Sequence, residues 1–163
     1  MSAAPAVSVV VPTCRRPQPL ALAVRSVFAQ TGVDPAATEL VVVDNDPAGS
    51  AADAAAVLAA EAPFPLRYVH EPTPGVASAR NTGVAAAAAG LIAFLDDDEE
   101  ASPGWLAALL QAQARFDADV VFGPVRGMAP SGVRRHRAYL EALWSREGPA
   151  EAGADRARLR LRR

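Results

Sequence analysis

Short apolar runs alternate with helical patterns through most of the chain, and this alternation limits the fold more than any other feature of the sequence. Runs at residues 7–11, 40–43, 91–95 and 120–122 lack the polar alternation of a half-exposed strand, which indicates burial on both faces; residues 66–70 are a weaker candidate. Helical signals lie between them: an apolar face at residues 20, 24, 27 and 28, alanine-rich stretches at 50–60 and 76–89, and a Ser-Pro start at 102–103 for a helix ending near residue 116. The pattern predicts an α/β fold with a mostly parallel sheet flanked by helices.

The composition narrows the class of protein further. The chain has 163 residues, of which 51% are apolar, and this is enough for one domain with a sizeable core. A net charge of −2 gives no sign of nucleic-acid binding, so we expect none. Cys14 is the only cysteine, which fits a reducing compartment, and the longest apolar run, at residues 84–95, is too short to cross a bilayer. Because the N-terminus shows no signal-peptide pattern, we expect a cytoplasmic protein.

Polar residues gather directly after the predicted strands. The carboxyl ends of parallel strands lie at one edge of a sheet, and ligands bind at that edge in such folds, so these loops are expected to share a site. The segments are Pro12-Thr13-Cys14-Arg15-Arg16, Asp44-Asn45-Asp46 and Asp96-Asp97-Asp98-Glu99-Glu100.

The acidic run at residues 96–100 places five carboxylates in succession. In an extended segment alternate side chains share a face, so Asp96 and Asp98 are expected to point one way and Asp97 the other. Two convergent carboxylates suit a hard cation such as Mg²⁺ or Mn²⁺, which usually takes one or two carboxylates, some waters and the phosphates of a substrate. The structural alternative is a solvated loop before a helix N-terminus, where negative charge is mildly favoured.

Three stretches link these loops to a known family. They are VSVVVPTCRRP at residues 7–17, LVVVDNDP at 40–47 and PGVASARNTGVAAAAAGLIAFLDDDEEASPGWL at 74–106. Together they resemble the family 2 glycosyltransferases, enzymes of the GT-A fold that use nucleotide-diphosphate sugars. The resemblance implies inverting sugar transfer to an unknown acceptor, a UDP-sugar as the favoured donor, and Mn²⁺ or Mg²⁺ as the cofactor.

The resemblance assigns roles on the nucleotide side of the site. Pro12 and Thr13 match the loop that lines the nucleobase pocket, and Asp44 matches the acid that contacts the base, typically uracil. Arg80, within Ala-Arg-Asn, matches a basic residue near the nucleotide, and charge-assisted bonds from arginine to phosphate fit that role.

Further roles concern the acidic run. Asp96 and Asp98 match the Asp-X-Asp motif that holds the metal and the ribose–diphosphate region, and Glu99 stands where many relatives carry another acid for the metal. The expected nucleotide site also takes in Arg15 and Asp97. Ordinary interpretations as turn, cap or solvated residues stay open for these positions.

The resemblance does not extend to a catalytic base. Family members use an Asp or Glu, usually within a Glu-Asp pair well after the Asp-X-Asp motif, to deprotonate the acceptor hydroxyl. Glu141 and Glu147 are the late acids before Gly148, and neither has that context, so no catalytic base is assigned. A truncated, catalytically inactive nucleotide-sugar-binding module is therefore one alternative. A nucleotidyltransferase is another, although the loop PTCRRPQPL lacks the glycine that such an enzyme needs.

The C-terminal segment differs in character. Residues 1–130 form the expected nucleotide-sugar-binding domain, and residues 131–163 an arginine-rich helix and tail, with one apolar helical face at residues 139, 140, 143 and 144. The terminal RARLRLRR is either a solvated end or a binder of phosphates or anionic lipid, which would make the protein membrane-peripheral. Since the sheet of the family extends beyond this length of chain, we expect an apolar edge covered by a helix or by a second copy in a homodimer.

Overall fold

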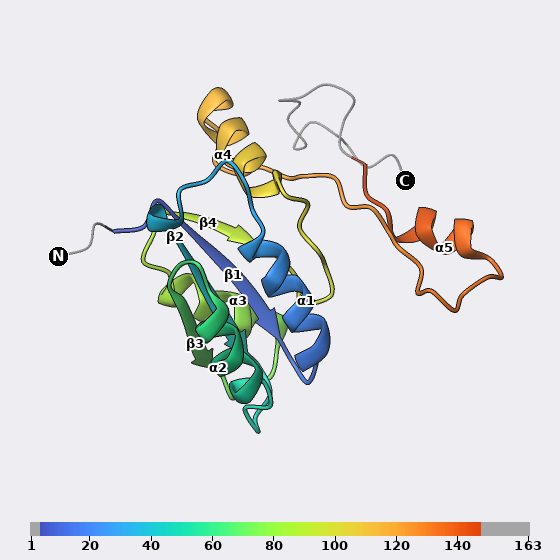
Figure 1. The fold of residues 1–163 in the computed structure, drawn as a ribbon, viewed down its shortest axis with the longest axis horizontal. Coiled ribbons are helices and arrows are strands. Elements are labelled where there is room, and N and C mark those ends of the chain that lie inside the picture. The colour runs from blue at the N-terminus through green and yellow to red at the C-terminus, as the bar shows by residue number, and fades with distance from the viewer. Residues whose placement is uncertain (1–3, 148–163) are drawn as a thin grey trace. The chain divides into compact units, whose positions relative to one another are not determined.

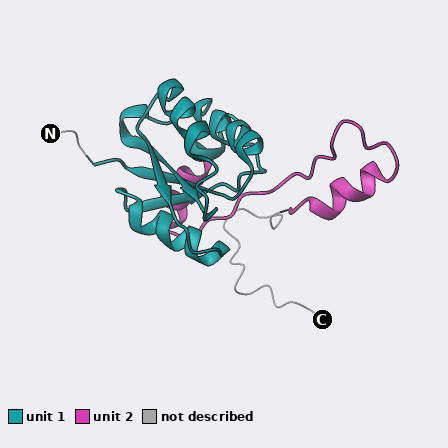
Figure 2. Ribbon diagram, turned by 90° about the horizontal axis from the view of Figure 1, so that it is seen from below, with its two compact units in different colours: residues 1–107 teal, residues 108–163 magenta. Residues whose placement is uncertain are grey.

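A computed structural model describes residues 4–147, and its helices and strands follow the predicted α/β order (Figure 1). The strands are β1 (Val7–Thr13), β2 (Thr38–Asp44), β3 (Leu66–His70) and β4 (Leu91–Phe94). The helices are α1 (Pro17–Phe28), α2 (Ala52–Glu61), α3 (Val76–Ala86), α4 (Trp105–Phe116) and α5 (Arg137–Trp144), with a short 3-10 helix, η1, at Pro35–Ala37. The chain divides into two compact units, residues 1–107 and 108–163 (Figure 2). The division expected after residue 130, which follows a change in composition and the extent of the family resemblance, stays a prediction.

The sheet is parallel throughout and has the strand order β3-β2-β1-β4. Its register pairs Thr13 with Asp44 and Val10 with Phe94, so the carboxyl ends of β1, β2 and β4 lie at the same edge. The chain builds outward from β1 to β2 and β3 and then returns to add β4 on the other side of β1. This return makes a topological switch point between β1 and β4, the place where open α/β sheets bind ligands.

Helices cover both faces of this sheet. Helix α1 contacts β1 and α2, and α3 contacts β1, β2 and β3. Leu20, Val24 and Val27 of α1 are fully buried, which confirms the predicted apolar face. On the other face Val10, Val41 and other strand residues form a buried cluster with the α3 side chains. The core therefore buries β1 and β2 on both sides and leaves their carboxyl ends to carry polar loops. Strand β4 lies at an edge of the sheet and exposes Leu91 and Phe94, so the burial on both faces expected of residues 91–95 is wrong for this strand.

Two expected elements differ in the structure. Residues 120–122 form no strand; the backbone pairing nearest to them is an isolated antiparallel bridge between Val125 and Arg146. An apolar run becomes a strand only where a neighbouring edge satisfies its backbone, and side-chain character alone misled the prediction. Helix α3 ends at Ala86, short of residue 89, because Ala88 and Ala89 donate their backbone N–H groups to Glu39 and Ser8 instead.

The start of α4 is also different from the Ser-Pro prediction. The helix begins at Trp105, and Ser102 and Pro103 belong to the preceding turn. Gln30 explains the shift, since its amide donates to the Ser102 carbonyl at 2.8 Å and accepts from the Leu106 N–H at 2.9 Å. A side chain distant in sequence therefore caps this helix, which no local pattern reveals.

The second unit contains the expected late helix. Helix α5 covers the four residues of the predicted apolar face, and Arg137 and Glu141 form an ion pair of 2.9 Å along it. The RARLRLRR segment lies outside the described residues. Within residues 4–147, no helix has the length and apolar character needed to cross a bilayer.

Candidate functional site

A cavity of about 440 Å³ lies at the switch point between the carboxyl ends of β1 and β4. It is bounded by the loops after β1, β2 and β4 and by the first turns of α3, so the three polar loops predicted to share a site do so. The residues that line it are Pro12, Thr13, Cys14, Arg16, Asn45, Val76, Ala79, Arg80, Asp96, Asp97 and Asp98. Of the predicted site residues, Arg15, Asp44 and Glu99 are not in this lining.

Thr13 and Asp97 join the floor of the cavity. Both are buried, and the Thr13 hydroxyl donates to Asp97 Oδ2 at 2.7 Å. Thr13 ends β1 and Asp97 follows β4, so this bond links the two strands across the switch point. Asp97 thus points inward, as the alternation of side chains predicted, while the side chains of Asp96 and Asp98 are 49% and 60% exposed.

Two arginines are bonded to the carboxylates at positions 96–98 of the acidic loop. Arg16 Nη1 donates to Asp97 Oδ1 at 3.2 Å and to Asp98 Oδ2 at 2.8 Å. Arg80 Nη2 donates to Asp96 Oδ1 at 2.7 Å, and its guanidinium lies 5.8 Å from the centre of the Phe94 ring. The carboxylate of Asp97, followed by Asp98, raises the pKa of Arg16. The like charges that the sequence concentrates here are therefore partly balanced by cations from the β1 loop and from α3.

The acidic loop offers a donor set that suits a metal ion, although the residues 4–147 contain no group of three or more His, Cys, Asp or Glu side chains placed to hold one. Asp96 and Asp98 supply hard carboxylate oxygens with large exposed fractions. Mg²⁺ and Mn²⁺ are commonly held by one or two carboxylates together with substrate phosphates, so these two side chains fit the implied cation.

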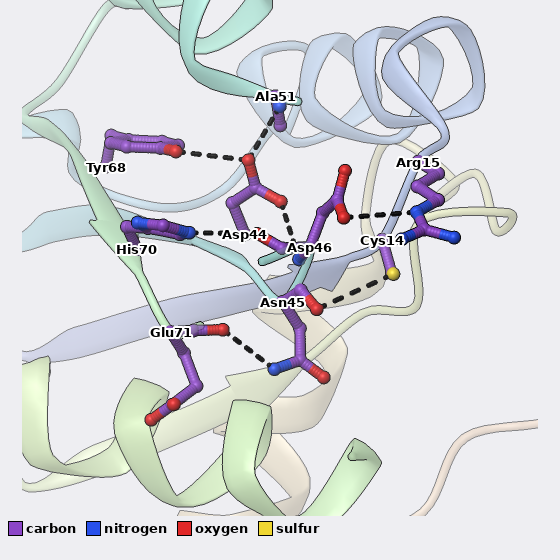
Figure 3. Close-up of polar contacts among 9 residues, drawn as sticks. All are labelled: Cys14, Arg15, Asp44, Asn45, Asp46, Ala51, Tyr68, His70 and Glu71. Atoms are coloured by element: carbon purple, nitrogen blue, oxygen red, sulfur yellow. Dashed lines mark hydrogen bonds and ion pairs between the residues drawn. The ribbon is translucent and has the colours of Figure 1, made fainter. Parts of the chain in front are cut away.

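Asp44 is fully buried and belongs to the frame of the site (Figure 3). Its Oδ1 accepts from the Asp46 N–H at 3.0 Å, and its Oδ2 accepts from the Ala51 N–H at 2.6 Å and the Tyr68 hydroxyl at 3.1 Å. Burial, followed by the bond to Asp44, raises the pKa of Tyr68 to about 12. The carboxylate predicted to meet a base accepts these protein donors, and its contact with a base stays a prediction.

Asp46 and Arg15 close the outer side of this network. Arg15 adopts a left-handed backbone conformation, with φ of 58°, and its Nε donates to Asp46 Oδ1 at 3.1 Å. The Asp46 carbonyl oxygen accepts a hydrogen bond from His70 Nε2 at 2.8 Å, so that histidine also supports the β2 loop (Figure 3). Arg15, predicted to contact nucleotide, is thus engaged with the β2 loop.

Asn45 and Arg16 belong to the polar loops expected to share a site, but sequence reasoning assigned neither of them a role of its own. The Asn45 amide donates to the carbonyls of Glu71 and Thr73 at 3.0 and 2.7 Å and accepts from the Gly75 N–H at 2.8 Å, so it fixes the loop before α3. A polar residue between two aspartates gave no separate signal. Arg16 was visible only as the second of two adjacent arginines, and its partners lie more than eighty positions away.

Glu99 faces a second, smaller cavity of about 220 Å³, which is lined by Pro19, Leu22 and residues 97–100. Its carboxylate accepts from the Asp96 N–H at 3.4 Å, within the turn that follows β4. Burial raises the pKa of Glu99, and the charges of Asp96 and Asp98 act in the same direction. Glu99 therefore shapes the acidic turn, and a share in metal binding stays a prediction.

The stability of the fold is expected to depend on acidic pH through the carboxylate of Asp46. Burial opposes its ionisation, but hydrogen bonds from Ser50, Arg15 and the Ala48 backbone outweigh this and hold the pKa of the carboxyl below 3.8. A pKa that is lower in the folded state contributes stability above the unfolded pKa, and this contribution is lost as pH falls through the folded value. We expect Asp46→Asn to be less stable than wild type at pH 7, with the difference shrinking below pH 3.8. Urea unfolding at a series of pH values measures this difference in the free energy of unfolding, and Asp119→Asn, at an exposed position, is the control. A difference that does not change with pH would contradict the lowered pKa of Asp46.

A parallel sheet in the order β3-β2-β1-β4, with arginines and carboxylates meeting at its switch point, defines an open α/β protein with a cavity where such sheets bind ligands. The chain matches the family model described as Glycosyl transferase family 2 over residues 8–159. Because the match covers most of the chain, the protein belongs to glycosyl transferase family 2, as its motifs indicated.

Two proteins of Rhizobium meliloti (strain 1021) are similar to most of the chain. Succinoglycan biosynthesis protein ExoM is 38% identical over 136 residues, which are 83% of this chain and 41% of ExoM. Succinoglycan biosynthesis protein ExoW is 35% identical over 123 residues, which are 74% of this chain and 38% of ExoW. The chain thus spans less than half the length of these relatives.

Solved structures share the fold. TarS of S. aureus, residues 1–349, has a TM-score of 0.62 at 21% identity, over 79% of this chain and 38% of that one. Mannosyltransferase PcManGT from Pyrobaculum calidifontis has a TM-score of 0.59 at 24% identity, over 79% of this chain and 37% of that one. These likenesses confirm the GT-A fold.

Proposed function

We propose that the protein transfers a sugar, with inversion, from a nucleotide-diphosphate sugar to an acceptor hydroxyl in a metal-dependent reaction. The observation that carries the proposal is the cavity at the switch point, where Arg16 and Arg80 meet the carboxylates of the acidic loop. Family membership supports the reaction class. Structures of TarS with UDP and with UDP-GlcNAc, and of PcManGT with GDP-Man and Mn²⁺, support a nucleotide sugar and a divalent ion as ligands. The favoured donor is a UDP-sugar.

The residues divide into those that meet the donor and those that hold them in place. In the proposal, Pro12 and Thr13 border the base, and Arg80 binds the diphosphate. Asp96 and Asp98 hold the divalent ion, which when bound neutralises charge on the departing diphosphate. Buried Asp97 fixes the loop that carries both carboxylates.

The second group lies outside the cavity lining and supports the loops that form it. Asp44 anchors the β2 loop and the start of α2 through its buried carboxylate, and Arg15 braces the same loop through Asp46. Their contribution to donor binding is therefore one of position, and their replacement would disturb the cavity through Asn45, which follows Asp44 in the chain and lines it.

A nucleotide-sugar-binding module without transferase activity is the second candidate. The carboxylates that line the cavity within residues 4–147 belong to positions 96–98, and each is bonded to an arginine. A general base needs a carboxylate that can reach the acceptor hydroxyl. This observation favours binding over transfer for the described part of the chain.

A thermal-shift experiment tests the shared part of both candidates. UDP, GDP, dTDP and CDP are each added with Mn²⁺ or with chelator to wild type and to Asp98→Asn. We expect a shift of several degrees with UDP and Mn²⁺, since ligand at about 100 times its dissociation constant stabilises by about 2.7 kcal/mol. The shift should be small with chelator and small in the variant.

Glu100→Gln is a suitable control, because it removes one charge from the same run outside the lining of the larger cavity. It should keep the wild-type shift. If no nucleotide stabilises wild type, both candidates fail. Release of UDP from UDP-sugars in the presence of acceptors then separates transfer from binding.

A further inference from the structure

Arg16 is bonded to Asp98, one of the two carboxylates that hold the cation in the proposed donor site. It stands directly before α1 and follows Arg15, whose left-handed backbone turns the chain at the end of β1. One nitrogen, Nη1, makes both bonds, at 3.2 Å to Asp97 and 2.8 Å to Asp98. The Arg16 side chain is 53% exposed and lines the larger cavity, so a ligand there can reach it.

The charge at this point is nearly balanced without any ligand. Three carboxylates, at positions 96, 97 and 98, face two guanidiniums, those of Arg16 and Arg80, which leaves a net charge of −1. A divalent cation alone would have to displace an arginine or be repelled by it. A diphosphate offers the arginines new acceptors and brings the negative charge that balances the cation.

We propose that Arg16 is a positioning residue that exchanges partners: it holds Asp97 and Asp98 in the nucleotide-free protein and moves to the donor diphosphate on binding, which frees Asp98 for the cation. This inference rests on the proposed donor site. The loss at Asp98 costs little, because that ion pair is exposed and such pairs are weak. Buried Asp97 keeps the hydrogen bond from Thr13. The arginine–phosphate bonds gained are charge-assisted and use a planar fork of donors. Nucleotide and cation should therefore bind cooperatively, through Arg16.

The test measures Mn²⁺ binding to the nucleotide-free protein by electron paramagnetic resonance. Arg16→Gln should bind Mn²⁺ about tenfold more tightly than wild type, because the guanidinium no longer competes with the cation for Asp98. Arg25→Gln is the matched control: it removes an arginine from α1, where Arg25 pairs with Glu61 on the surface, and it lies outside the cavity lining, so it should bind Mn²⁺ as wild type does. Arg16→Lys keeps the charge and should stay close to wild type.

A second experiment measures the binding of UDP and of uridine by calorimetry, with chelator present to remove divalent ions. Arg16→Gln should weaken UDP binding about tenfold and leave uridine binding unchanged, since the lost bonds concern phosphate alone. Melting curves of the variants without ligand confirm that each is folded.

The outcomes are distinct. Equal or weaker Mn²⁺ binding by Arg16→Gln, absence of Mn²⁺ binding by all variants, or an equal loss for UDP and uridine would each overturn the role of Arg16. Failure of the donor site itself would appear in wild type, as lack of any UDP binding with or without Mn²⁺.

Discussion

Replacement of Asp44 by alanine is expected to lower the free energy of unfolding by about 3 kcal/mol, because it leaves buried donors without an acceptor. The carboxylate receives the N–H groups of Asp46 and Ala51 and the hydroxyl of Tyr68, and it has no exposed surface. Equilibrium unfolding in urea measures the loss. A change below about 1 kcal/mol would show that the loop re-forms its bonds with water and that Asp44 is no anchor.

Tyr68 provides the control for this network. Tyr68→Phe should cost about 1 kcal/mol in wild type and nearly nothing in the Asp44→Ala background, since the bond it loses is already gone there. The ionisation of Tyr68 gives an independent readout. Its pKa should fall from about 12 towards 10.0 in Asp44→Ala, although burial, the larger cause, keeps part of the shift.

The same tyrosine sets a dependence on alkaline pH. Because the pKa of Tyr68 is raised in the folded protein, its contribution to stability is complete below pH 10.0 and is lost as pH rises through about 12. Wild type should therefore lose stability in this window more steeply than Tyr68→Phe. Parallel curves for the two proteins would contradict the bond to Asp44.

The order of elements could be predicted because it depends on local pattern. Continuous apolar runs, such as residues 40–43, are distinctive of strands buried on both faces, and β2 is indeed buried along its whole length. The run at 120–122 has the same local character and forms no strand. What separates the two is the presence of a neighbouring edge, and that depends on the whole topology.

The candidate site was predictable as a set of loops but not as a set of contacts. The strand ends placed Thr13 and Asp97 at one cavity as expected, and Arg80, which the family resemblance assigned to the site, joins them from α3. Asp44 and Asn45 are neighbours in sequence, yet one is buried and the other lines the cavity, because successive side chains of an extended segment point to opposite sides. The pairing of Arg16 with Asp98 joins positions 16 and 98, and composition alone cannot select that pair from the other arginines and acids.

The close approach of α3 to the sheet is a further constraint that one residue controls. Gly83 is buried within α3, and a Cβ atom built there would collide with Val10 Cγ1 and stand 3.3 Å from Val43 Cγ2. Helix propensity favours almost any residue over glycine at this position, by up to about 1 kcal/mol. Packing acts in the opposite direction, because interiors are close-packed and added atoms force strain.

We therefore expect Gly83→Val to lower the free energy of unfolding by about 3 kcal/mol, the upper range for overpacking, despite the gain in helix propensity. Gly90→Ala is the control, since a Cβ there meets nothing within 4 Å, and it should leave stability nearly unchanged. Truncating the opposing side chain should relieve the strain, so Gly83→Val with Val10→Ala should be more stable than Gly83→Val alone. Arg80 lies on the same helix and reaches Asp96, so a displacement of α3 should also move Arg80. The folded molecules of Gly83→Val should therefore bind UDP more weakly than wild type, whereas Gly90→Ala should bind UDP as wild type does.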